Sequence, residues 1–173
     1  MGFKGYKWSG LSTFSDGSSW HQRASRFLKQ TDWTALCDHA SKINGTTCIL
    51  DPQITMGGRH MVRILNFADG SRWIARLRMR FATRIEKQVA GQLLQREVDC
   101  IQLVRARTTV PTPAIHDYLV DIDNAIGAPF MLMDCLPGNV AMDLNFHHVP
   151  TQYQPSFYAD MAKIQVSNSY NSS

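Results

Sequence analysis

The sequence lacks the features that mark several large classes of protein. No apolar run approaches the roughly 20 residues of a membrane-spanning helix, and no apolar segment near the N-terminus resembles a signal peptide. Cysteine is scarce, and the few that occur have neither CxxC pairing nor metal-ligand spacing. We therefore expect a cytoplasmic protein with no membrane partner. Its cysteines are expected to be buried or free thiols in a reducing compartment: Cys37, Cys48, Cys100 and Cys135.

Charge is also sparse. Charged residues make up 18% of the chain, the net charge is +4, and the basic residues form no long Lys/Arg block. Such a pattern does not indicate nucleic acid as a partner. The chain does have 44% hydrophobic residues over a length of 173, which is enough for one domain with a real core.

The most informative stretch runs from Met56 to Met79. Asp69-Gly70 separates two β-favouring runs, Met61–Phe67 and Ser71–Met79. Asp-Gly at such a place is a strong hairpin signal, because glycine tolerates a positive φ. A third run, Cys48–Thr55, precedes them. The pattern predicts an antiparallel meander of three strands.

Two glycines and one cation stand out in this meander. Gly57 and Gly58 lie at the tip between the first two strands, where backbone N–H groups can approach a phosphate because no Cβ intervenes. Ile74 and Arg76 lie two residues apart on the third strand and so share one face. We expect a fixed positive charge within reach of whatever the glycine tip covers.

Helices are predicted on both sides of the meander. Thr31–Asn44 carries an apolar stripe at helical spacing, with Thr31 as its cap and Gly45 as its terminator. His39 flanks that stripe, and we expect it to be a hydrogen-bonded structural residue. The second helix is predicted at Thr83–Arg105. Its expected stripe consists of Ile85, Val89, Leu93, Ile101 and Val104.

Glu97 falls on the stripe of the second helix, four residues after Leu93 and four before Ile101. A carboxylate on a buried face needs a charged or hydrogen-bonding partner, because desolvation is costly. Arg76 on the preceding strand is an attractive partner. The alternative is that Glu97 lies at the edge of the helix and reaches water. The sequence leaves both interpretations open.

Beyond the second helix the chain returns to strands. Val110-Pro111-Thr112-Pro113 ends that helix, because two prolines this close cannot continue it. Strands are predicted at Ala114–Val120 and Pro129–Cys135, and Leu136-Pro137-Gly138 stops the second one. A last helix is predicted at Gln154–Val166.

Both ends of the chain are polar. Over residues 1–30 we expect a poorly ordered, loosely packed arm, with one helical turn near Gln22–Leu28. Over residues 167–173 we expect a disordered tail.

In this order the elements resemble the N-terminal lobe of a protein-kinase-like fold, and specifically the aminoglycoside phosphotransferase family in its fungal-type branch. The matching residues are Gly57-Gly58, Asp69-Gly70, Trp73–Leu77, Glu97, Val110–Pro113 and Gly127–Met133, running into Leu136–Gly138. The resemblance implies an α+β fold with an antiparallel sheet of about five strands, one long packed helix, and added N-terminal and C-terminal helices. It also implies a domain order: the arm at 1–30, the lobe at 31–138, a linker and the start of a second lobe at 139–166, and the tail at 167–173.

The resemblance implies a role for each matching residue. Gly57 and Gly58 would cover the ATP phosphates, Arg76 would replace the strand lysine that binds the α- and β-phosphates, and Glu97 would hold that cation. Arginine keeps the charge and adds fork geometry. The adenine ring would be met by Ile74 on its face, by the gatekeeper Met133, and by the Asp134 carbonyl and the Leu136 N–H at its edge.

The sequence departs from the family beyond the hinge. It contains no H-x-D segment with a downstream Asn and a later Asp near a Gly, so the catalytic base and the Mg²⁺ ligands of the family have no candidates. Three hypotheses remain open. The chain is a truncated small-molecule kinase that binds ATP weakly and is inactive alone, or a regulatory nucleotide-binding module, or a non-enzymatic interaction domain. Without a lower lobe, apolar surface near the hinge, including parts of Phe130–Leu136, would be exposed, so aggregation or a protein partner is expected.

Overall fold

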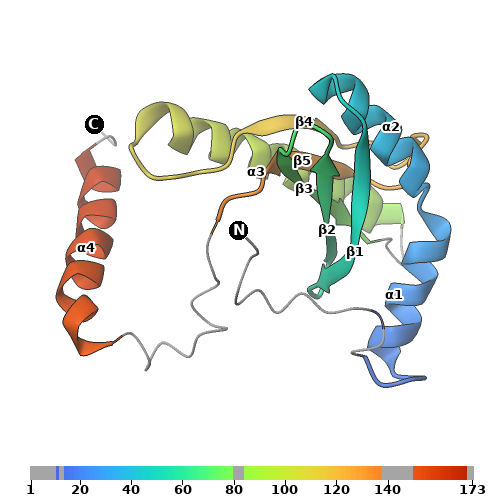
Figure 1. The fold of residues 1–173 in the computed structure, drawn as a ribbon, viewed down its shortest axis with the longest axis horizontal. Helices are drawn as coiled ribbons and strands as arrows, with labels where there is room; N and C mark the ends of the chain where they lie inside the picture. Colours follow the sequence, from blue (N-terminus) through green and yellow to red (C-terminus); the bar gives the residue numbers. More distant parts are fainter. Residues whose placement is uncertain (1–10, 12–13, 80–83, 138–149, 171–173) are drawn as a thin grey trace.

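The computed structural model describes residues 11, 14–79, 84–137 and 150–170 (Figure 1). Its centre is a five-stranded antiparallel sheet with the strand order β1-β2-β3-β5-β4. The expected α+β class, with a five-stranded antiparallel sheet and added helices, is confirmed. In chain order the elements are α1 (Ser19–Gln30), α2 (Trp33–Asn44), β1 (Cys48–Met56), β2 (His60–Phe67), β3 (Arg72–Arg78), α3 (Arg84–Arg107), β4 (Ile115–Leu119), β5 (Phe130–Asp134), the 3-10 turn η4 (Thr151–Tyr153) and α4 (Gln154–Tyr170).

Local turn chemistry builds the meander as predicted. The β2–β3 hairpin closes at Gly70, whose φ of 84° is left-handed and whose N–H donates to the Phe67 carbonyl at 3.0 Å. The Asp69 carboxylate accepts the N–H of Ser71 at 2.8 Å and holds the turn. Gly45 ends α2 with a φ of 80°, again as predicted.

The cap of α2 lies one residue later than predicted. Asp32 is the cap, and its carboxylate accepts the N–H of Ala35 at 2.9 Å. Thr31 instead ends α1. A carboxylate caps a helix as well as a hydroxyl does, so either residue was suitable by chemistry alone. The position of α1, which the sequence did not reveal, decides between them.

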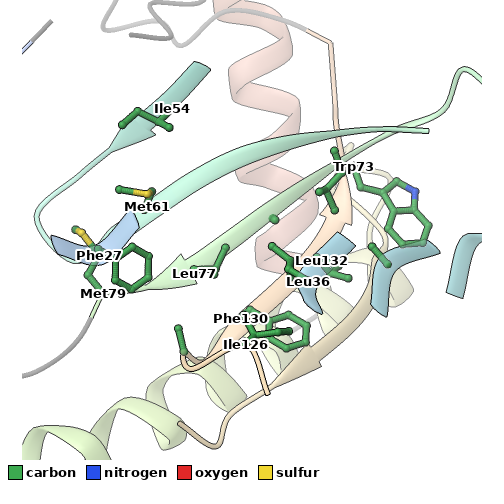
Figure 2. Close-up of a cluster of buried hydrophobic side chains, with 14 of the residues drawn as sticks. Phe27, Leu36, Ile54, Met61, Trp73, Leu77, Met79, Ile126, Phe130 and Leu132 are labelled. Atoms are coloured by element: carbon green, nitrogen blue, oxygen red, sulfur yellow. The ribbon is translucent and has the colours of Figure 1, made fainter. Parts of the chain in front are cut away.

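The larger of two cores lies between the sheet and the N-terminal helices. Because side chains alternate along a strand, the odd-numbered residues of β2 and β3 face α1 and α2. Figure 2 shows these side chains converging from both helices and from the strands. The core includes Phe27, Leu36, Met61, Leu65, Trp73, Leu77, Phe130 and Leu132.

The helix α1 belongs to this core, which corrects the expected loosely packed arm from residue 19 onward. It is 12 residues long, and the Ser18 side chain caps it by accepting the N–H of His21 at 3.1 Å. Its buried residues are only two, Ala24 and Phe27. This apolar face is short, and the nearby apolar residue Trp20 is exposed. The sequence of α1 therefore shows no clear helical period.

The second core lies on the opposite face of the sheet, under α3. Leu94 and Val98, one turn apart on α3, pack with Met131 of β5. Ile101 continues the same face of the helix and is partly buried. The sheet is therefore covered by helices on both sides, and α3 rests mainly on β4 and β5.

The predicted stripe of α3 is wrong in phase over its first half, whereas Ile101 and Val104 are partly buried, as predicted. Val89 and Leu93 are exposed, and the buried residues come one position later. At Gly91, between these two positions, a Cβ would lie only 3.3 Å from the Val120 carbonyl oxygen, so α3 runs close to the residue that follows β4. The Ile85 side chain lies outside the described part of the chain.

The strand β1 is an irregular edge. Its register with β2 shifts between Leu50 and Ile54, around Asp51 and Pro52. The Asp51 carbonyl accepts a hydrogen bond from Arg63 Nη2 at 2.7 Å, which holds the bulge against β2.

The run from Phe130 to Leu136 is exposed only in part, as expected. The residues Phe130 to Leu132 are buried, because β5 lies between β3 and β4 and has helices on both faces. Leu136, at 39%, is the exposed large apolar residue of this run. The apolar surface predicted for a partner protein at the hinge is therefore small.

At the C-terminal end, α4 lies away from the sheet in Figure 1, and most of its described side chains are exposed. It continues to Tyr170, so residues 167–170 are helical where a disordered tail was predicted. The remainder of the predicted arm, linker and tail, at residues 1–10, 12–13, 139–149 and 171–173, lies outside the described residues. All four cysteines are free thiols. None of the helices described is long and apolar enough to cross a membrane.

Candidate functional site

Three of the predicted site residues share the sheet face that α3 covers. Ile74 and Arg76 lie on β3, and Met133 of β5 pairs directly with Ile74. Directly opposed residues of an antiparallel pair point to the same side. The apolar pair of Ile74 and Met133 therefore lies beside the charge of Arg76.

Arg76 of β3 and Glu97 of α3 form an ion pair, as predicted. The Glu97 side chain is 33% exposed, so it lies at the edge of the buried stripe and is paired there; each of the two interpretations was partly right. Burial, and then the charge of Arg78, lower the pKa of Arg76. A guanidinium nevertheless remains protonated at physiological pH. Arg76 is therefore a permanent cation in a fixed place.

His60, which the sequence did not single out, is the third member of this group. Its Nδ1 lies 3.4 Å from Nη2 of Arg76. His60 opens β2 opposite Arg78, on the same face as Arg76. Burial, followed by the charges of Arg76, Arg78 and Arg59, lowers the pKa of His60 to about 4. The imidazole is therefore neutral at physiological pH.

The lowered pKa of His60 predicts a loss of stability in acid. The unfolded chain protonates His60 below pH 6.5 and the folded chain only near pH 4, so stability is complete above 6.5 and falls as the pH drops toward 4. Allowing for partial exposure, we expect His60 to cost about 1 kcal/mol of unfolding free energy between pH 6.5 and 5. Urea melts of the wild type and His60→Asn at both pH values measure this difference. An equal pH dependence in the two proteins would contradict it.

The glycine tip forms the turn between β1 and β2. The Gly57 N–H donates to the His60 carbonyl at 3.0 Å, so it closes the hairpin and is not offered to a ligand. This corrects the expectation that N–H groups of both glycines cover phosphates. Neither Gly57 nor Gly58 has a left-handed φ, and a Cβ at either would meet nothing within 4 Å. The fold requires glycine at neither position, and what the pair provides is open space above the turn.

Asp134 was predicted to offer its backbone carbonyl to the edge of adenine. In the structure its side chain ties β4 to β5. Its carboxylate accepts the N–H of Ala114 and contacts Nε2 of His116, both at 2.8 Å. The His116 ring stacks on Trp73, with the ring centroids 3.8 Å apart. These contacts brace the end of β5, from which the chain leads to the exposed Leu136. Nothing in the local sequence pattern links these residues, because their pairing depends on the sheet order.

A second polar pair lies on the other face of the sheet. Nε2 of His39 is 2.5 Å from Oδ2 of Asp117, and the imidazole packs edge-on against Phe130. The prediction of a hydrogen-bonded His39 is confirmed. A hollow of about 300 Å³ opens beside it, between α2 and the loop that includes Asn124 and Ile126. It is separated from Arg76 by the sheet.

The arrangement around Arg76 suits an anion that carries an apolar ring. Arg76 supplies directed N–H donors, Ile74 and Met133 supply an apolar strip, and the glycine turn supplies room. Among the described residues, no three His, Cys, Asp or Glu side chains come together as a metal site. Neither a protein-family model nor a curated protein matches this chain.

Proposed function

We propose that the chain is the nucleotide-binding lobe of a small-molecule kinase that resembles the aminoglycoside phosphotransferases. Such a kinase transfers the γ-phosphate of ATP to a hydroxyl acceptor. The lobe binds adenine and phosphates and depends on catalytic groups that lie outside it. By itself it is inactive.

The observation that carries this proposal is the ion pair of Arg76 with Glu97. Phosphoryl transfer depends mainly on positioning and on charge stabilisation, and a cation held by a helix carboxylate is suited to both. A guanidinium has five N–H donors, and Glu97 and His60 do not use them all. The remaining donors match phosphate oxygens in fork geometry.

The surroundings of Arg76 support an adenine nucleotide in particular. Ile74 and Met133 lie directly opposite each other on the same face, and both are partly exposed, although Met133 also packs against the core under α3. We infer that a purine ring lies against this apolar pair. The glycine turn leaves space for phosphates, since no side chain rises from Gly57 or Gly58. The order of helix, three strands, long helix and two strands agrees with the resemblance seen in the sequence.

Magnesium enters this proposal only with the nucleotide. The described residues include no cluster of acidic and histidine side chains that could hold the ion. The alternative is that the chain is a non-catalytic interaction module. Such a module would not bind nucleotide, so a nucleotide-binding experiment distinguishes the two functions.

Titration with a fluorescent ATP analogue tests the proposal. We expect the purified chain to bind the analogue weakly, and Arg76→Ala to bind about tenfold more weakly, because a hydrogen bond to a charged group is lost. Arg96→Ala, which removes an exposed arginine from α3, is the matched control and should bind as the wild type does. With magnesium and a panel of hydroxylated acceptors, the wild type should consume no ATP.

Two results would contradict this proposal. If the wild type does not bind the analogue, or if Arg76→Ala binds it equally well, the chain is not a nucleotide-binding lobe of this kind. Turnover that disappears in Arg76→Ala would show that the chain holds a complete active site.

A further inference from the structure

The guanidinium of Arg76 is held from two sides. Glu97 binds Nη1 from α3, and His60 lies 3.4 Å from Nη2 on the β2 side. Glu97 supplies the opposite charge that a partly buried arginine needs. The contact with His60 adds no opposite charge, because the imidazole ring is neutral. It can therefore act only by fixing the direction in which the Arg76 guanidinium points.

The chemistry of the two groups determines which atom donates. A guanidinium carries only donors, so His60 can bind Arg76 only through an unprotonated Nδ1. The ring must then carry its proton on Nε2. The imidazolium form cannot make this bond, because both of its nitrogens are donors.

We propose that His60 is a positioning residue that orients the Arg76 guanidinium toward the phosphates of a nucleotide by accepting a hydrogen bond at Nδ1. The ligand in this inference rests on the proposed function, whereas the contact itself rests on geometry. With Nη1 turned to Glu97 and Nη2 to His60, the plane of the guanidinium is set. Its other N–H donors then keep one direction, which is how a fixed group lowers the cost of binding.

His60 also joins the cation to the glycine turn. Its carbonyl oxygen accepts the N–H of Gly57 at 3.0 Å, while its ring binds Arg76. A single residue therefore sets both the closure of the turn and the direction of the guanidinium beside it. A movement of the turn would be transmitted to Arg76 through one side chain.

The surrounding charges keep His60 in its accepting form. Arg59, Arg76 and Arg78 all act on the ring, and Glu97 is engaged by Arg76. A proton on His60 would add another cation to this group and would remove the acceptor. Together with burial, these charges lower the pKa of His60 to about 4, so the acceptor persists across the physiological range.

The first test examines the ring and needs no nucleotide. Long-range ¹⁵N spectra of histidine rings distinguish the two neutral tautomers from the imidazolium, and the His60 signals are assigned by their loss in His60→Asn. We expect the Nε2–H tautomer at pH 7, persisting on acidification to pH 5. An Nδ1–H tautomer, or an imidazolium at pH 7, would overturn the proposal whether or not a nucleotide binds.

The second test separates positioning from packing by comparing three variants. Asparagine bears its amide oxygen on Cγ, where Nδ1 of histidine is attached, whereas glutamine places its oxygen one bond farther out. We expect His60→Ala and His60→Gln to bind the fluorescent ATP analogue about tenfold more weakly than the wild type. His60→Asn should stay within about twofold. Thermal melts establish that each variant is folded.

Each pattern of results has a distinct meaning. Equal losses in all three variants would show that His60 acts by packing, and unchanged binding in His60→Ala would show that it has no role; either result overturns the proposal. If the wild type binds no nucleotide, the proposed function fails and the positioning role fails with it. The ring spectrum still decides whether His60 accepts from Arg76.

Discussion

Replacing Phe27 by alanine should lower the free energy of unfolding by about 3–5 kcal/mol, the range for large aromatic residues removed from a packed core. Phe27 is only 3% exposed, and its ring meets Trp33 edge-on with the centroids 6.2 Å apart. Figure 2 shows it in the same core cluster as Met61 and Met79. The substitution would leave a cavity between α1 and the sheet, which the rigid strands cannot close.

Urea denaturation of Phe27→Ala and Trp20→Ala measures this effect. Trp20 lies on the same helix but is 45% exposed, so its replacement should cost less than about 1 kcal/mol. Similar small losses in both variants would show that α1 does not pack on the sheet and that the N-terminal segment is the loose arm predicted from the sequence.

The ion pair should show a strong energetic coupling. Arg76→Ala and Glu97→Ala should each destabilise the protein by about 1–3 kcal/mol, less than for a fully buried pair because the side chains are 27% and 33% exposed. Removing either residue leaves the other charge without its partner. The double variant should therefore lose at least about 1 kcal/mol less than the sum of the two single losses.

A double-mutant cycle in urea gives this coupling directly. Gln95→Ala combined with Arg76→Ala is a suitable control, because Gln95 lies on the same helix but bonds to Asp99 and Tyr118. The losses of unfolding free energy caused by Gln95→Ala and Arg76→Ala should be additive. Strict additivity for Arg76 and Glu97 as well would mean that the two side chains do not interact in solution.

Much of the sheet could be predicted because its signals are local. Asp69-Gly70 determines a tight turn through the conformational freedom of glycine, and the flanking β-favouring runs can then pair in only one way. The ion pair could be predicted for a similar reason. A glutamate on an apolar stripe needs a partner, and Arg76 on the preceding strand was the suitable cation.

The parts that were missed depend on contacts between distant segments. The close approach of α3 to the carbonyl of Val120 at Gly91 is a contact that no period within the helix reveals. His60 joins the site only because the β2–β3 register places it on the same face as Arg76. That register is fixed by the turn at Gly70, so a closer examination of the hairpin could have identified His60. The anchoring of α1 by Ala24 and Phe27 left no comparable signal.

The bulge in β1 has a consequence for self-assembly. The outermost strand of an open sheet offers unpaired N–H and C=O groups to other chains, and this invites edge-to-edge aggregation. In β1 the shifted register between Leu50 and Ile54 interrupts that row, and Pro52 has no N–H to offer. At the opposite edge, β4 has only 5 residues and is itself irregular between Ile115 and Asp117. Both borders of the sheet are thus poor templates for a further strand, which keeps neighbouring molecules from adding to it.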